Sequence, residues 1–297
     1  MYTAEISRNN PSMFLFLIDQ SGSMQDVLDP ENVRPLKEPV VVDGRTYTHS
    51  ASGSTKAEAL ADAINRLIQN LCIKCAKEEG VRDYFYVGVI GYGQQVGPGF
   101  GGSLAGRDLV PISEVAEMPA RVETRSKKVS DGAGGLVDQE VKFPIWFDPV
   151  ANGGTPMCKA LEEARRIVQD WLGQHPDCFP PVVIHITDGE STDGDPSGPA
   201  ASLRGLSSTD GDVLLFNLHL SSQKKRPIEY PNTDAELPDQ YAKLLFQMSS
   251  PLTPFMITAA RQEGYGVAEG ARGFVFNADL VATIKFLDIG TRPSNLR

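Results

Sequence analysis

The chain has 297 residues, of which 41% are hydrophobic and 22% charged, a composition typical of a soluble globular protein. Its formal net charge of -10 disfavours nucleic acid and anionic membranes as partners, because both are themselves negatively charged. No apolar run approaches the roughly 18 residues of a membrane span, and the N-terminus lacks the pattern of a secretory signal, so a cytoplasmic location is expected.

Short apolar strands alternate with longer amphipathic runs, which predicts an α/β fold: a Rossmann-like, doubly wound, mostly parallel sheet flanked by helices. The strands are near-continuous apolar runs, as expected of strands buried on both faces. They are predicted at Met13–Asp19, Tyr84–Tyr92, Val182–Asp188, Asp212–Leu220 and Gly273–Ala278. Helices are predicted over Thr55–Glu79, Thr155–Gln174, a segment starting at Leu252, and Ala278–Gly290.

The helix ends carry local signals. Thr55 is a predicted N-cap and Gly80 a stop signal for the first helix. Thr155 followed by Pro156 gives the second helix a cap and a first-turn proline, and Thr253 followed by proline repeats that pattern. Cys72 and Cys75 lie on one face of the first helix, so core positions are favoured over a redox or zinc site.

Two stretches interrupt this alternation and are predicted to be β-hairpin insertions, within residues 25–54 and 93–150. In the first, Asp43 and Gly44 lie between β-prone residues, a strong hairpin signal. In the second, strand-like arms flank the Gly-rich turn Asp131–Gly135. No repeat or linker divides the chain, so residues 1–297 are interpreted as a single domain.

Oxygen-bearing side chains follow three of these segments. Asp19, Ser21 and Ser23 come at the end of the first strand, Thr155 follows a Gly pair, and Asp188 ends a later strand. Ligands of open α/β folds bind at the carboxyl ends of the strands, so these residues are expected at one edge. Carboxylates with hydroxyls suit Mg²⁺, Mn²⁺ or Ca²⁺ and do not suit zinc. The alternative is that they cap strand ends and satisfy a turn.

The DxSxS of residues 19–23, the Gly-Gly-Thr of residues 153–155 and the Thr-Asp-Gly of residues 187–189 resemble the metal-ion-dependent adhesion site (MIDAS) of von Willebrand factor A (VWA) domains. The segments "DQSGSM", "VGVIGYG" and "GARGFVFNADL" further resemble those of stand-alone bacterial VWA proteins of the TerY-like group, found in tellurite-resistance and stress-response systems.

The resemblance implies a VWA fold, with Ser21, Ser23 and Thr155 as hydroxyl ligands and Asp19 and Asp188 acting mostly through water and hydrogen bonds. Near-octahedral Mg²⁺ would keep one position for a Glu or Asp of a partner protein. It also implies a cytoplasmic bacterial stress or conflict system, with a kinase, phosphatase or other stress-system protein as partner. The expected function is a metal-dependent protein-binding module and not an enzyme.

Two alternatives remain open. Asp19 could be the nucleophile of a metal-dependent phosphatase or phosphotransferase, although such haloacid-dehalogenase-type enzymes generally use Asp-x-Asp and position 21 is Ser. The chain could also be a scaffold with a vestigial site. The insertions are expected at the rim of the metal face, where they would select the partner or supply an acidic residue such as Asp26, Asp29 or Asp148.

Overall fold

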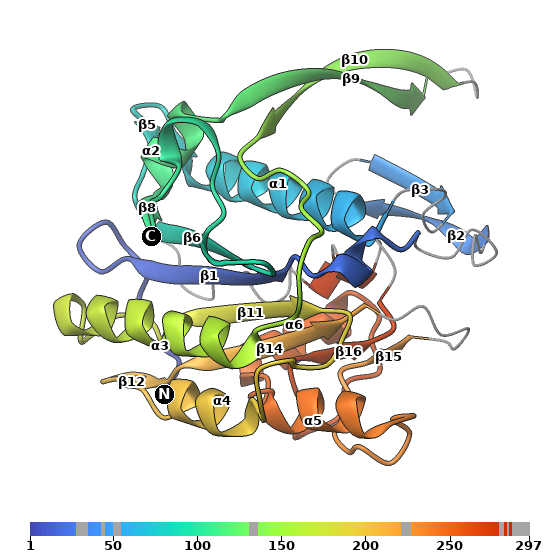
Figure 1. Ribbon diagram of the computed structural model, residues 1–297. Helices are drawn as coiled ribbons and strands as arrows, with labels where there is room; N and C mark the ends of the chain where they lie inside the picture. Colours follow the sequence, from blue (N-terminus) through green and yellow to red (C-terminus); the bar gives the residue numbers. More distant parts are fainter. Residues whose placement is uncertain are drawn as a thin grey trace.

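The computed structural model describes residues 1–27, 35–42, 45–49, 55–130, 136–220, 227–278, 282–283 and 285–286. These residues form an α/β fold in which helices cover both faces of a mostly parallel central sheet (Figure 1). Within the described part of the chain, no helix is both long enough and apolar enough to cross a membrane.

The described residues build an eight-stranded sheet in the order β15-β16-β14-β11-β1-β6-β7, with β8 also paired to β6. Its parallel strands are β1 (Ser12–Asp19), β6 (Phe85–Tyr92), β11 (Val182–Thr187), β14 (Leu214–His219) and β16 (Phe274–Phe276). Antiparallel additions are β15 (Ile228–Glu229), β7 (Val96–Pro98) and β8 (Val110–Pro111). The five predicted strands are thus confirmed, with ends shifted by at most two residues.

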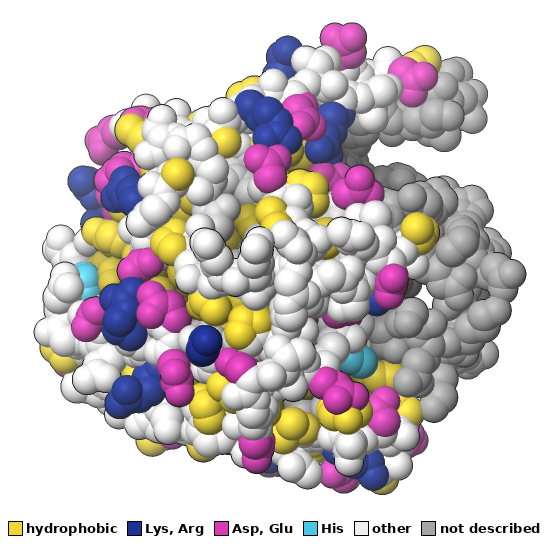
Figure 2. Space-filling view, in the orientation of Figure 1, with side chains coloured by type: hydrophobic (Ala, Val, Ile, Leu, Met, Phe, Trp, Pro, Cys, Tyr) yellow, Lys and Arg dark blue, Asp and Glu magenta, His cyan; other side chains and the backbone are white. Residues whose placement is uncertain are grey.

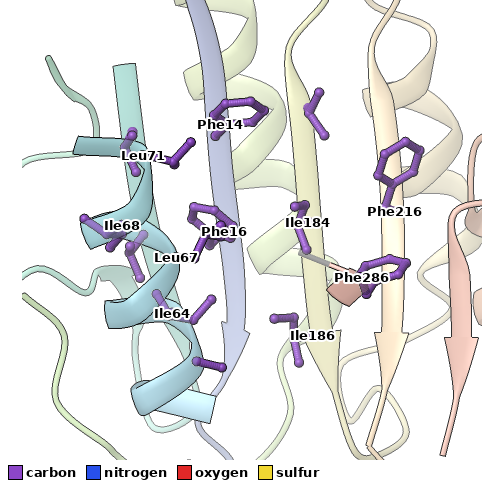
Figure 3. Packing of buried hydrophobic residues seen from close by; sticks show 14 of the residues in the cluster. Phe14, Phe16, Ile64, Leu67, Ile68, Leu71, Ile184, Ile186, Phe216 and Phe286 are labelled. Carbon is purple, nitrogen blue, oxygen red and sulfur yellow. The ribbon is translucent and has the colours of Figure 1, made fainter. Parts of the chain in front are cut away.

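Side chains of β1 alternate between two hydrophobic clusters, one on each face of the sheet. Phe14 and Phe16 pack with α1 (Lys56–Cys75), as Figure 3 shows. Met13 and Leu15 share the other cluster with α3 (Met157–Gln174). Full burial of each large apolar side chain contributes about 1.5–3 kcal/mol. Further helices are α2 (Ile112–Glu117), α4 (Ser197–Arg204), α5 (Gln240–Met248), α6 (Pro254–Gln262) and the short 3-10 turns η1 (Gly22–Gln25) and η3 (Gly102–Leu104).

Helix α1 begins as predicted but ends early. Thr55 and Glu58 form a capping box, in which the Thr55 hydroxyl accepts from the Glu58 N–H at 3.1 Å and the Glu58 carboxylate accepts from the Thr55 N–H at 2.9 Å. The predicted end at Glu79 is wrong, because β4 (Ala76–Lys77) pairs with β5 (Gly80–Val81) directly after the helix. Cys72 and Cys75 are buried as predicted, and burial raises the pKa of both thiols to about 12.

The other predicted caps have different outcomes. Thr253 is confirmed as the cap of α6, since its side chain accepts from the Met256 N–H. Thr155 is not the cap of α3: the residue at that position is Pro156, and its side chain makes no capping bond. Of the predicted last helix, residues 282–283 and 285–286 are helical and the remainder, after Ala278, lies outside the described residues.

Replacing Thr55 with alanine is expected to lower the free energy of unfolding by about 1 kcal/mol, because an orphan N–H of the first turn loses its acceptor. The measurement is urea unfolding followed by circular dichroism. Thr258→Ala is the matched control, since Thr258 is exposed on α6 and, among the described residues, its hydroxyl donates to the Pro254 carbonyl alone. Equal destabilisation by both variants would contradict a specific role for the cap.

Both predicted hairpins are formed by antiparallel strand pairs. β2 (Pro35–Val42) pairs with β3 (Arg45–His49), and β9 (Arg121–Ser130) pairs with β10 (Leu136–Ile145). The turns at 43–44 and 131–135 lie outside the described residues. Residues 93–150 also include β7 and β8, which belong to the main sheet, and α2, which packs against β6 and α1. A minor pair joins β12 (Ser207–Ser208) to β13 (Gly211–Asp212).

The base of the β9–β10 hairpin is fixed to α1. Buried Asn65 of α1 donates to the Phe147 carbonyl at 2.7 Å and accepts from the Trp146 N–H at 2.8 Å. Arg125 forms an ion pair with Asp62 at 2.9 Å. A groove of about 360 Å³ lies between these elements, and Figure 2 shows charged side chains of both signs where the hairpin leaves the body of the molecule. The hairpin is therefore an ordered addition at its base.

Candidate metal centre

The strand order reverses between β1 and β11. The chain passes from β1 to β6 on one side, whereas it passes from β11 to β14 on the other. Adjacent strands whose connections diverge in this way leave a crevice at their carboxyl ends, where open α/β sheets bind ligands. Asp19 is the last residue of β1, and Asp188 immediately follows β11. The topology therefore places both carboxylates at the switch point.

Asp19 is fully buried at the floor of this crevice. One carboxylate oxygen accepts from the Ser21 N–H at 2.8 Å, and the other accepts from the Thr187 hydroxyl at 2.6 Å. Burial raises the pKa of Asp19, and hydrogen bonds from Ser21 and Thr187 act against that rise. Because these bonds do not fully offset the cost of burying the charge, a cation beside Asp19 would stabilise its ionised form.

Ser21, Ser23 and Asp188 form a hydrogen-bonded chain next to Asp19. The Ser23 hydroxyl donates to Asp188 Oδ1 at 2.7 Å, and the Ser21 and Ser23 hydroxyl oxygens are 3.0 Å apart. Since the Ser23 proton is directed at Asp188, the Ser21 hydroxyl is the donor within the serine pair. The spacing of two residues thus places both hydroxyls next to each other. The fold brings Asp188, which is 165 residues from Ser23 in the sequence, to the same place.

Thr155 lies in the loop before α3, beside Gly189, the residue that follows Asp188. Its side chain is buried, and its backbone is fixed by Thr192, which accepts from the Thr155 N–H at 3.0 Å and donates its own N–H to the Thr155 carbonyl at 2.9 Å. Thr155 Oγ1 lies 3.9 Å from the point where a Cβ on Gly189 would be. This hydroxyl takes no part in the hydrogen bonds found among the described residues, so its lone pairs are available to a ligand.

Glycines let the loops approach one another closely. The Gly22 N–H donates to the Gly153 carbonyl at 3.0 Å, and the Asn152 N–H donates to the Gln20 carbonyl at 2.6 Å. Gly153 has a φ of +89, and a Cβ there would lie 2.4 Å from the Gln94 backbone nitrogen. The backbone at the Gly pair thus holds the loop of Thr155 against the loop of Ser21.

Lys56 is the site residue that sequence reasoning missed. Its Nζ donates to Asp188 Oδ2 at 2.7 Å and lies 3.4 Å from Asp26 Oδ2. The Lys56 side chain is only 3% exposed, and that of Asp188 is 0% exposed. The available signal was its position directly after the predicted cap Thr55 at the start of α1, which faces this edge of the sheet.

The acidic residues proposed to reach the site have separate surroundings. Asp26 contacts Lys56, whereas Asp148 forms an ion pair with Arg121 at 2.7 Å. Asp29 lies outside the described residues. In Figure 1, β2–β3 lies on the side toward which β1 ends, and β9–β10 runs over α1 toward that same side. Of the two described residues, Asp26 is therefore the one that lies beside the cluster, through Lys56.

The donor set limits which ion could bind. Within the described residues, no group of three or more His, Cys, Asp or Glu side chains could hold a metal. The cluster offers two carboxylates, Asp19 and Asp188, and three hydroxyls. Such a set does not suit zinc, which takes nitrogen and sulfur ligands, and it suits a hard cation that retains bound water.

A buried polar chain continues beneath Asp19 on the α3 face. The Tyr92 hydroxyl and His185 Nε2 are 2.6 Å apart, and His185 Nδ1 lies 2.7 Å from Asn217 Oδ1. Asn217 Nδ2 donates to the Ser249 hydroxyl at 2.9 Å. The amide oxygen must accept, so His185 Nδ1 carries the proton and Tyr92 donates to Nε2. His185 is thus a buried core histidine with both ring nitrogens hydrogen-bonded.

No family model and no curated protein matches the chain. Solved structures that it resembles include proximal thread matrix protein 1 from the mussel byssus, at 16% identity and a TM-score of 0.41 over 84% of this chain and 43% of that one. A variant of the PilB minor pilin from Streptococcus sanguinis has 11% identity and a TM-score of 0.34 over 61% and 30%. Three N-terminal domains of the type V pili tip protein Mfa5 from Porphyromonas gingivalis have 12% identity and a TM-score of 0.31 over 61% and 20%. The chain spans less than half of each of these structures, and at such TM-scores none supports an argument about function.

Proposed function

We propose that this chain is a metal-dependent protein-binding module of the VWA type. Asp19, Ser21, Ser23, Thr155 and Asp188 would hold a divalent cation, Mg²⁺ or else Mn²⁺ or Ca²⁺. The ion would receive a Glu or Asp from a partner protein, because a hard cation prefers carboxylate oxygen. The observation that carries the proposal is the convergence of two buried carboxylates and three hydroxyls at the topological switch point.

The site residues have distinct roles in this proposal. Ser21, Ser23 and Thr155 would supply neutral hydroxyl ligands, so most of the ion's charge would not be neutralised by direct contacts. Asp19 and Asp188 would orient those hydroxyls and bound water, as Asp188 already does by accepting from Ser23 at 2.7 Å. A bound ion of this kind would attract an incoming carboxylate, which is the interaction that recognition of an acidic partner requires.

The geometry does not favour the phosphatase alternative. A nucleophilic carboxylate must reach phosphorus, yet Asp19 is 0% exposed and hydrogen bonds from Ser21 and Thr187 already engage both of its oxygens. Ser21 also lacks the proton-transfer capacity of a second carboxylate. The proposed setting is a cytoplasmic bacterial stress or conflict system, with a kinase, phosphatase or other stress-system protein as the partner.

Asp19→Asn is expected to weaken Mn²⁺ binding at least about tenfold, because the site loses one of its negative charges. Titration calorimetry with Mn²⁺ measures this, with circular dichroism to verify folding. Ser21→Ala and Thr155→Ala are expected to weaken binding as well, since each removes a hydroxyl. Asp138→Ala, an exposed carboxylate on β10, is the matched control and keeps wild-type affinity.

The recognition step needs its own experiment. Pull-downs with wild type and Asp19→Asn, each in Mg²⁺ and in EDTA, are expected to retain a partner only for wild type in Mg²⁺. Equal Mn²⁺ affinity in wild type and Asp19→Asn would contradict the metal site. Metal-dependent hydrolysis of p-nitrophenyl phosphate that disappears in Asp19→Asn would instead support the enzyme.

A further inference from the structure

A buried ammonium already lies inside the proposed metal site. Lys56 Nζ donates to Asp188 Oδ2 at 2.7 Å, while Asp188 Oδ1 accepts from Ser23 at 2.7 Å. Both oxygens of this carboxylate are therefore engaged, one by a hydroxyl and one by a fixed positive charge. Lysine is almost never fully buried unless it is paired, and the Lys56 side chain is 3% exposed.

The placement of Lys56 runs against local preference. It is the first residue of α1, where the positive end of the helix dipole disfavours a cation. The backbone nevertheless fixes it there, because the Lys56 N–H donates to the Asp26 carbonyl at 2.9 Å and the capping box of Thr55 and Glu58 closes around it. A cation held at an unfavourable helix end is stabilised by the carboxylate it meets, which is Asp188.

The charges of the buried groups can be counted. Asp19 and Asp188 contribute two negative charges and Lys56 one positive charge, which leaves a net charge of -1. The side chain of Asp26, 3.4 Å from Lys56, is 61% exposed, so water screens its charge. A bound divalent ion would bring the buried cluster to +1, whereas without Lys56 the loaded site would be neutral. The ammonium thus lowers the affinity of the site for the ion and increases the attraction of the loaded site for an anion.

We infer that Lys56 is a specificity-determining residue of this site, whose ammonium weakens divalent-ion binding and leaves the loaded site positively charged, so that a carboxylate is favoured as the last ligand. The inference rests on the proposed function and deepens it by assigning the preference for an acidic partner to a residue of the chain. It adds a positioning effect as well, since Lys56 holds Asp188 Oδ2 away from direct coordination while Ser23 holds Oδ1.

The test uses Mn²⁺ as the metal probe and acetate as the carboxylate probe. Lys56→Met keeps the length of the side chain and removes its charge, and it is expected to bind Mn²⁺ about tenfold more tightly than wild type. Electron paramagnetic resonance of free Mn²⁺ measures this affinity. Acetate binding to the Mn²⁺-loaded protein, followed by the relaxation of water protons, is expected to be about tenfold weaker in Lys56→Met.

Lys56→Arg is the matched control, because it keeps the positive charge, and its affinities for both probes are expected to stay close to those of wild type. Lys56→Gln, which retains a hydrogen-bond donor to Asp188, replaces Lys56→Met if that variant does not fold. Weaker or unchanged Mn²⁺ binding in the neutral variants, or unchanged acetate binding, would overturn the inference. Lys56 would then serve only to hold Asp188 in place. If wild type and Asp19→Asn bind Mn²⁺ equally, the proposed function itself fails, and that result is separate from any effect of Lys56.

Discussion

Gly153→Ala is expected to destabilise the protein by about 3 kcal/mol and to abolish Mn²⁺ binding, because the backbone conformation of Gly153 would be strained for alanine and its position is crowded. Its φ is +89, a conformation that side chains with a Cβ rarely adopt, and the added Cβ would lie 2.4 Å from the Gln94 backbone nitrogen. Backbone atoms cannot move aside as a flexible side chain would. The loop must therefore shift, and the Gly153 carbonyl would lose the Gly22 N–H at 3.0 Å.

That shift would reach the site through Thr155, which follows Gly153 by two residues, and through Ser21, which precedes Gly22. Urea unfolding and calorimetric titration with Mn²⁺ measure the two effects. Gly173→Ala is the matched control: Gly173 lies in α3 with open space around its Cβ position. There alanine is expected to stabilise by about 0.5–1 kcal/mol. Wild-type stability and Mn²⁺ affinity in Gly153→Ala would show that the loop tolerates displacement.

The strands were predictable because strands buried on both faces consist mostly of apolar residues, a local pattern that can be recognised in the sequence. β1 is a mostly apolar run that ends in Asp19, and the mostly apolar β11 is followed directly by Asp188, so both the strands and the positions of the two carboxylates follow from the sequence. Their contact follows from topology, since parallel neighbours in the order β6-β1-β11 bring their carboxyl ends to one edge. Ser21 and Ser23 reach the same edge because they lie in the loop that directly continues β1.

The missed features depend on contacts between distant segments. The ion pair of Lys56 with Asp188 joins residues 132 apart, and no local pattern marks a buried lysine. Helix α4 reads Ser-Gly-Pro-Ala-Ala-Ser-Leu-Arg and lacks a clear apolar period, so packing against the sheet decides its conformation. Helix α5 did carry a signal, because Asp239 caps it by accepting from the N–H groups of Tyr241 and Ala242.

Acidification is expected to destabilise the protein through two buried histidines. Burial lowers the pKa of both His185 and His219 to about 4, whereas an unfolded histidine titrates near 6.5. Between these pH values the unfolded chain binds more protons than the folded protein. The histidines therefore contribute fully to the free energy of unfolding above about pH 6.5, and this contribution falls as the pH drops toward about 4. The loss by the lower limit is about 3 kcal/mol for each histidine. Urea unfolding across this pH range measures it.

His185 offers the sharper test because both of its ring nitrogens are engaged. Its Nε2 accepts from Tyr92 at 2.6 Å and its Nδ1 donates to Asn217 at 2.7 Å, so a proton added to Nε2 would deprive the Tyr92 hydroxyl of its acceptor. His185→Gln is expected to lower stability at neutral pH and to reduce the pH dependence by about half, since one of the two buried histidines remains. His175→Gln, at a half-buried histidine stacked on Trp171, is the matched control. The raised pKa of Asp19 acts in the opposite direction, because the folded state then takes up a proton more readily. A pH dependence unchanged in His185→Gln would therefore mean that groups other than the buried polar chain control acid unfolding.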